Sequence, residues 1–165
     1  LDGSKLYREF FTSASYRYKR EWTLTGGLQI QSYNQERYEG KPEAPMVQTI
    51  TPFAEFLYKI DRKKSVRSEV QCMNTAEDFG SWLFGLVEFT LSPSWTFTAS
   101  DMFNYDPKRT SKAIHYPRFD VFYTHRTSRF SLSYIKQVEG VVCSGGICRL
   151  EPAFSGVRLT VDTQF

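Results

Sequence analysis

Charged and amide side chains recur at alternate positions along several segments of this chain, and alternate side chains of a β-strand point to the same face. We predict one polar surface formed by Glu9, Arg17, Gln29, Gln31, Glu55, Lys59, Arg67, Glu69, Gln71, Glu88, Arg118, Asp120, Arg158 and Asp162. Acids and bases mixed around a water-filled lumen create a transverse electric field that favours small hydrophilic solutes. The same side chains can instead pair across neighbouring strands and stiffen the wall. The sequence favours neither reading over the other.

Catalytic and metal-binding groupings are sparse. His115 falls in a predicted loop and His125 at a predicted turn, separated by about ten strand residues at roughly 3.3 Å each. No nucleophile elbow, zincin helix or phosphate-binding glycine loop occurs. The spacing of Asp101, Asn104 and Asp106 does not fit a calcium loop. We therefore expect no enzyme, metal or cofactor, although a hydrolase stays open if its other catalytic residues lie outside this sequence.

The segment 157–165 indicates which kind of sheet carries the polar surface. Apolar and polar side chains alternate in it, the apolar set being Val157, Leu159, Val161 and the terminal Phe165, and the polar set Arg158, Asp162 and Gln164. An apolar outside and a charged inside suit a barrel in lipid with a wet lumen. A soluble ligand-binding barrel, the weakest alternative, would keep its apolar side chains inside. We predict an all-β fold, an antiparallel up-and-down transmembrane β-barrel that ends on Phe165 as its C-terminal signature.

The sequence contains nine strand-like segments, the last of which ends the chain. The connections between them alternate in length. Short turns are predicted at 19–21, 61–65, 92–94 and 126–128, and long loops at 34–44, 106–113 and 138–152, with a less clear one after residue 73. Outer-membrane barrels have short periplasmic turns and long extracellular loops. This assignment puts the C-terminus in the periplasm.

Aromatic residues near the short turns predict a girdle at the membrane interface, made of Tyr16, Tyr18, Trp22, Tyr58, Phe89, Trp95 and Tyr123. Counted back from Phe165, the first strand starts outside the cell. A complete bacterial barrel has an even number of strands with both ends periplasmic. We therefore predict that residues 1–165 are one domain, about nine C-terminal strands of a larger barrel whose other strands lie upstream of Leu1.

Composition narrows the class of protein further. The mean hydropathy of −0.43 and the absence of any run near 18 apolar residues exclude membrane helices but not barrel strands. Lysine and arginine are scattered among acids, and the formal charge is only +3, so no nucleic-acid partner is expected. No secretory signal opens the sequence as given.

Two cysteines, Cys143 and Cys148, flank a Ser-Gly-Gly-Ile segment in the last long loop. On the predicted topology this loop folds in an oxidising compartment, so a disulfide that closes a small glycine-rich hairpin is the leading prediction. Zinc is the competing interpretation, but two cysteines without a nearby histidine make a poor ligand set. Cys72 is left over as a small apolar residue.

Two features conflict with a simple barrel. Asp101 falls on the lipid-facing positions of its strand, where a charge is costly unless a bulge redirects it. Trp82, Phe84 and Leu86 fall on positions of their own strand that should face the lumen. The second feature predicts that a plug, an inward loop or a narrowed lumen packs there, unless the assigned register is wrong by one residue.

The end of the chain resembles a known family. Cys143-Ser-Gly-Gly-Ile-Cys148-Arg-Leu-Glu-Pro-Ala153, followed by Gly156-Val-Arg-Leu-Thr-Val161 and Phe165, resembles the C-terminus of the DUF6029 type of outer-membrane barrel from Bacteroidota. Leu150 and Glu151 depart from the aromatic-aliphatic pair expected after Arg149. The resemblance implies a Gram-negative outer membrane and a barrel, and it supplies no substrate because the family has no assigned function.

Two functions remain open on this evidence. The first is a porin-like or transporter channel wall for small hydrophilic solutes, in contact with outer-membrane lipid. The second is a structural or partner-binding subunit of an outer-membrane complex, with a plugged lumen and other outer-membrane proteins as partners.

Overall fold

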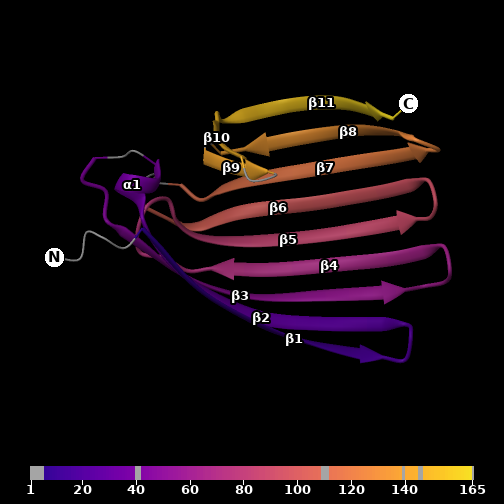
Figure 1. Cartoon of the computed structure of the whole chain (residues 1–165), viewed down its shortest axis with the longest axis horizontal. Coiled ribbons are helices and arrows are strands. Elements are labelled where there is room, and N and C mark those ends of the chain that lie inside the picture. Colours follow the sequence, from indigo (N-terminus) through magenta and orange to yellow (C-terminus); the bar gives the residue numbers. More distant parts are fainter. Residues whose placement is uncertain (1–5, 40–41, 109–111, 139, 145–146, 165) are drawn as a thin grey trace.

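The computed structural model describes residues 6–39, 42–108, 112–138, 140–144 and 147–164. It contains a nine-stranded antiparallel meander, in the order β1-β2-β3-β4-β5-β6-β7-β8-β11 (Figure 1). The strands are β1 (Tyr7–Tyr18), β2 (Trp22–Asn34), β3 (Met46–Lys59), β4 (Lys64–Met73), β5 (Gly80–Leu91), β6 (Trp95–Pro107), β7 (Ile114–His125), β8 (Ser128–Gln137) and β11 (Phe154–Thr163). The predicted all-β class and number of strands are confirmed. The sheet is open, because β1 and β11 are its two edges and do not pair with each other.

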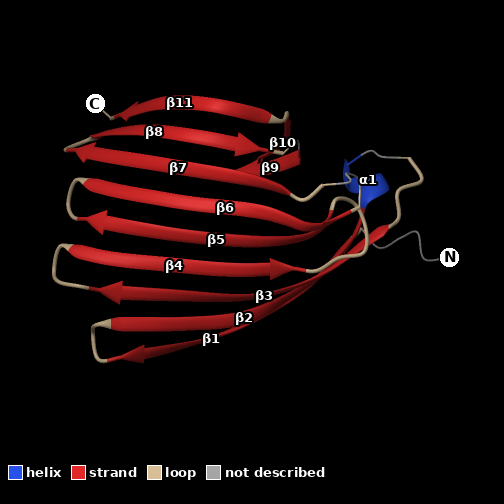
Figure 2. Cartoon of the chain, turned by 180° about the vertical axis from the view of Figure 1, so that it is seen from behind, coloured by secondary structure: helices blue, strands red, loops and turns tan. Residues whose placement is uncertain are grey.

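The short connections all lie at one end of the sheet and the longer ones at the other (Figure 2). The short turns are 19–21, 60–63, 92–94 and 126–127. At the far end, the β2–β3 connection contains the one-turn helix α1 (Gln35–Glu39), and the β8–β11 connection contains the hairpin β9 (Gly140–Ser144) and β10 (Ile147–Glu151). Within the described part of the chain, the alternation of turn lengths is confirmed, and the small hairpin predicted around Cys143 and Cys148 is present.

The pairing register gives the sheet two chemically different faces. One row of directly opposed residues reads Tyr18, Trp22, Tyr58, Val66, Phe89, Phe97, Val121, Leu132 and Leu159. The next position along each strand gives Arg17, Thr23, Leu57, Arg67, Glu88, Thr98, Asp120, Ser133 and Arg158. We call the faces that carry these rows the apolar face and the polar face. Consecutive strand residues point to opposite faces, so the two patterns extend along all nine strands.

The apolar face is exposed over much of its area. Leu159 is 70% exposed, Val157 67% and Phe119 54%. In soluble monomers, exposed apolar side chains are usually scattered rather than contiguous.

Aromatic contacts cluster on the apolar face close to the short turns. The Trp22 ring lies 5.4 Å from the Tyr18 ring and 6.0 Å from the Phe56 ring. The Trp95 ring lies 4.6 Å from that of Tyr123 and 5.9 Å from that of Phe97. The register places every predicted girdle residue on this face, and their position at a membrane interface stays a prediction.

The β3–β4 turn shows how one short connection is fixed. The Asp61 carboxylate accepts hydrogen bonds from the backbone N–H groups of Lys63 at 2.7 Å and Lys64 at 2.9 Å. The Lys64 ammonium lies 4.0 Å away. The Lys63 N–H in particular lowers the pKa of the Asp61 carboxyl below its ordinary value, opposed by partial desolvation.

We predict that Asp61 stabilises the turn only in its charged form. A carboxyl with a lowered folded-state pKa contributes stability above its unfolded-state pKa and loses it as the pH falls through the folded-state pKa. Carbon-13 NMR of a side-chain-labelled sample should show Asp61 titrating below the ordinary aspartate range. Titration of Asp61 at or above that range would contradict the prediction.

Candidate functional site on the polar face

Arg67 is the centre of the densest charge cluster on the polar face. Its Nη1 atom lies 3.1 Å from Oε2 of Glu55 on β3 and 3.0 Å from Oε2 of Glu69 on β4. Its Nε atom lies 3.6 Å from Oε1 of Glu88, the residue directly opposite on β5. The Gln71 amide donates to the other Glu69 oxygen at 2.5 Å. Three carboxylates thus share one guanidinium, which leaves a net negative charge at this point of the face.

The four charged side chains of this cluster are partly exposed, between 18% for Glu69 and 36% for Glu55. Water therefore reaches the cluster and screens it, and charge-assisted hydrogen bonds still fix its geometry. Such a cluster can attract cations from solution or hold the strands together, and its partial exposure is compatible with both.

A second cluster lies on β7 and β8. Arg118 donates to both carboxylate oxygens of Asp120, from Nε at 2.8 Å and from Nη2 at 3.0 Å. Ser133, directly opposite on β8, donates to Asp120 Oδ1 at 2.5 Å. The Asp120 side chain is 4% exposed, so this charge is desolvated and fully engaged. Sequence reasoning missed Ser133, because a serine partner is visible only once the strand register is known.

Four of the predicted polar residues, Arg118, Asp120, Arg158 and Asp162, come together only in part. Arg118 and Asp120 pair within β7, whereas the Arg158 guanidinium lies 5.7 Å from the centre of the Phe154 ring. Asp162 stands opposite Arg129 in the register. On β1, Glu9 accepts hydrogen bonds from the Gln29 amide at 2.5 Å and from the Tyr7 hydroxyl at 2.8 Å. All predicted polar residues lie on the polar face by register, and whether they line a lumen stays a prediction.

Aromatic side chains interrupt the polar face towards the longer connections. Trp82 is 9% exposed, and its ring lies 5.6 Å from that of Tyr116. Phe11 and Phe53 stack at 5.6 Å with an interplanar angle of 12°. The register confirms that Trp82, like Phe84 and Leu86, lies on this face.

Asp101 remains on the apolar face, where the sequence placed it. It stands opposite Gly85, and the register irregularity of this strand pair lies further along, at Ser81/Trp82, so no bulge redirects it. Its carboxylate contacts Nδ1 of His115 at 2.5 Å and accepts the Tyr116 backbone N–H at 3.1 Å. The prediction that His115 lies in a loop is wrong: it belongs to β7, because strand pairing with β6 extends to Ile114.

The remaining predicted positions carry less information. Cys143 and Cys148 are direct backbone partners in the β9–β10 hairpin, but their side chains, and Phe165, lie outside the described residues. The disulfide therefore stays a prediction. Cys72 is free and half-buried, with its Sγ atom 3.7 Å from the Tyr105 hydroxyl.

Where side chains are described, no three His, Cys, Asp or Glu residues gather as a metal site. No helix in the described ranges is long and apolar enough to span a membrane.

Comparison with known proteins gives one match. A family model described as "Family of unknown function (DUF6029)" matches residues 1–165. No curated protein and no solved structure matches the chain.

Proposed function

Since this chain belongs to the DUF6029 family, whose function is unknown, we propose from its own geometry that it forms part of the wall of an outer-membrane β-barrel that passes small hydrophilic solutes. The observation that carries the proposal is the division of the sheet into an exposed apolar face and a polar face with engaged charges. Lipid covers the first face and water the second, as in membrane barrels.

The positions of the aromatic clusters support an orientation. They lie near the short turns, which suits an interface between membrane and periplasm. The longer connections, with α1 and the β9–β10 hairpin, then face the outside of the cell.

Closure of the barrel requires strands beyond the nine. β1 and β11 both run from the end with the longer connections towards the end with the short turns, so their direct union would be parallel. An antiparallel closure needs an odd number of additional strands between these two edges. Those strands belong to a longer form of the chain or to another protein.

The aromatic patch on the polar face favours a second candidate. The Phe11 ring, which is 56% exposed and stacks on Phe53, forms apolar surface where a water-filled lumen needs none. A barrel whose lumen is plugged, and which serves as a structural or partner-binding subunit of an outer-membrane complex, would cover this patch.

Single-channel recording of the full-length protein in a planar bilayer tests the first candidate against the second. We predict stable conductance steps whose ion selectivity changes on charge reversal at Glu55 or Arg118. Val87→Thr on the apolar face is the matched control and leaves selectivity unchanged. Silence from correctly folded protein would reject the open channel in favour of the plugged barrel, and proteins that copurify would then be identified.

A mutation at His115 tests whether lipid covers the apolar face. In His115→Phe, Asp101 loses its imidazole partner and keeps only the Tyr116 N–H, and a carboxylate facing lipid without that partner should lower the free energy of unfolding by about 1–2 kcal/mol. In water the same pair, with His115 61% and Asp101 41% exposed, would contribute less than about 1 kcal/mol to the free energy of unfolding. The double variant Asp101→Leu/His115→Phe, which carries no charge at this point, should regain the stability of the wild type in bilayers. Equal stability of all three proteins in vesicles, measured by urea titration, would argue against lipid contact.

A further inference from the structure

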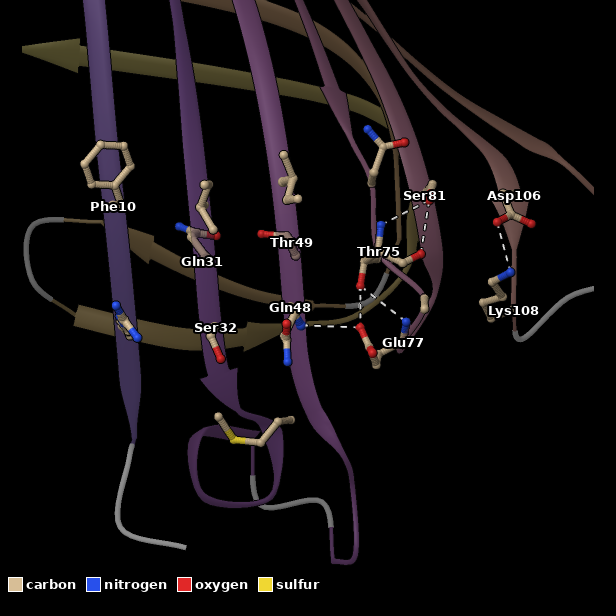
Figure 3. Close-up of a pocket in the computed structure, with 16 residues that line it drawn as sticks. Phe10, Gln31, Ser32, Gln48, Thr49, Thr75, Glu77, Ser81, Asp106 and Lys108 are labelled. Atoms are coloured by element: carbon tan, nitrogen blue, oxygen red, sulfur yellow. Dashed lines mark hydrogen bonds and ion pairs between the residues drawn. The ribbon is translucent and has the colours of Figure 1, made fainter. Parts of the chain in front are cut away.

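A cleft of about 1090 Å³ lies at the end with the longer connections, between β1, β2 and β3 on one side and the β4–β5 connection on the other (Figure 3). Its volume is at the upper end of small-molecule sites, which span roughly 300–1,000 Å³. Phe10 and Ile50 line it from the apolar face, whereas Gln31 and Thr49 belong to the polar face. A ligand on the apolar face therefore does not meet the Gln31 and Thr49 side chains.

Two neighbouring rows of opposed residues form the lining of the cleft on the apolar face. The row nearer the longer connections consists of Arg8, Ser32 and Gln48, and the next row consists of Phe10, Ile30 and Ile50. We call them the donor row and the apolar row. In Figure 3, Phe10 marks the apolar row, and Ser32 and Gln48 mark the donor row. Every member of the apolar row is at least 41% exposed, so an amphipathic molecule can lie across both rows.

The apolar row lies one membrane crossing away from the aromatic residues near the short turns. The segments 10–18, 22–30 and 50–58 each contain nine residues and connect the apolar row to the row of Tyr18, Trp22 and Tyr58. A tilted barrel strand needs about 9–11 residues to cross the hydrocarbon core. In the proposed barrel, the donor row therefore lies at the level of the lipid headgroups on the side opposite the aromatic residues.

Arg8 is the charge that stays available in the cleft. Lys108 Nζ lies 2.9 Å from Asp106 Oδ2, and Glu77 accepts the Gln48 N–H at 3.3 Å. Within the part of the chain that the structure describes, the exposed Arg8 side chain has no ion-pair or hydrogen-bond partner. β2 and β3 separate Arg8 from Glu77. A guanidinium without a partner next to lipid favours an anionic group.

Ser32 and Gln48 add neutral donors beside Arg8. Ser32 is directly opposite Arg8, and Gln48 is directly opposite Ser32, so neighbouring members of the row stand about 5 Å apart. The Ser32 hydroxyl and the Gln48 side-chain amide engage no other described residue. Guanidinium, hydroxyl and amide groups all donate hydrogen bonds to phosphate oxygens. Arg8 and a neighbouring neutral donor can thus reach the same phosphate group.

We propose that the donor row binds the phosphate of a lipid headgroup, while the acyl chains of that lipid lie on the apolar row. The inference rests on the proposed function, because it requires that lipid covers the apolar face. A free phosphate ion would use the donor row alone, so a lipid is the source that the two rows together favour.

Native mass spectrometry of the full-length protein, titrated with lipid in detergent micelles, tests the proposal. Phosphatidic acid and diacylglycerol with identical acyl chains differ only in the phosphate group. We expect phosphatidic acid to bind at least about fivefold more tightly, because hydrogen bonds to a charged group favour it. Arg8→Gln should reduce that preference to within about twofold.

Two further variants identify the rows. Arg17→Gln is the matched control, since Arg17 is an exposed arginine of the same strand on the polar face, and it should leave the preference unchanged. Phe10→Ser should weaken the binding of both lipids by a similar factor, because it removes apolar contact and no donor. A preference that survives Arg8→Gln, or that Arg17→Gln reduces equally, would overturn the proposal, as would unchanged binding in Phe10→Ser. Circular dichroism confirms that each variant is folded.

The outcomes also separate this site from the proposed function. Equal affinity for the two lipids, in a protein that requires detergent, would overturn the headgroup site and leave the barrel in place. A protein that is soluble without detergent and retains neither lipid would overturn both. The readout does not depend on conductance, so a plugged lumen leaves it unchanged.

Discussion

Gly27→Ala is expected to lower the free energy of unfolding by about 2–3 kcal/mol, the cost of forcing an additional methyl group into a close-packed position. A Cβ atom at Gly27 would run into the backbone carbonyl of Thr12 and would lie 2.6 Å from Cζ of Phe53. The absent side chain is what lets the Phe53 ring reach across β2 and stack on Phe11. The measurement is urea or guanidinium unfolding of the protein folded in detergent, followed by tryptophan fluorescence.

Gly85→Ala provides the matched control. Gly85 also lies within a strand, but a Cβ atom built there meets no other atom within 4 Å. Its replacement should change stability by no more than about 0.5 kcal/mol. Equal effects of the two substitutions would show that glycine in a strand, rather than the Phe53 contact, determines the loss.

Arg67→Met is expected to have the second large effect, on stability and selectivity together. The substitution leaves Glu55, Glu69 and Glu88 close to one another without their shared cation. Breaking a fully buried pair costs about 3–5 kcal/mol, and partial exposure reduces that to about 1–3 kcal/mol here. In the proposed channel, the uncompensated carboxylates should also raise the permeability of cations relative to anions.

Comparison of Arg67→Met with the double variant Arg67→Met/Glu69→Gln separates repulsion from lost packing. The double variant has one carboxylate fewer at this point of the face, so repulsion is weaker and its difference in stability from the wild type should be smaller. Arg17→Met, an exposed arginine on the same face, is the control and should change stability by less than about 0.5 kcal/mol. An equal loss of stability in the single and the double variant would assign the effect to packing alone.

The strands and their faces could be predicted from the sequence because alternation is a local property. Arg67, Glu69 and Gln71 are two residues apart in the sequence, and this spacing alone predicts that they share one face of their strand. The placement of Trp82 on the polar face followed in the same way, despite the conflict with a wet lumen. Short turns were equally visible, since turn residues such as Asp61 act within their own segment.

The partners of these residues could not be predicted, because pairing joins segments that are far apart in the sequence. Asp101 looked unpaired while His115 was assigned to a loop, and only the β6–β7 register brings the two together. Nothing in the sequence around Ser133 predicts its hydrogen bond to Asp120, which requires the register of β7 and β8. The hydrogen bond from the Gln48 N–H to Glu77 depends on how the β4–β5 connection folds back to β3, which no periodicity encodes.

The arrangement of the turns also bears on how such a sheet changes during evolution. Each short turn joins two neighbouring strands into a hairpin, and the hairpins follow one another without crossing. Duplication or deletion of one hairpin leaves the direction and the face of every other strand unchanged. Relatives of this protein can therefore differ in width by two strands at a time while the rest of the sheet keeps the chemistry of its two faces.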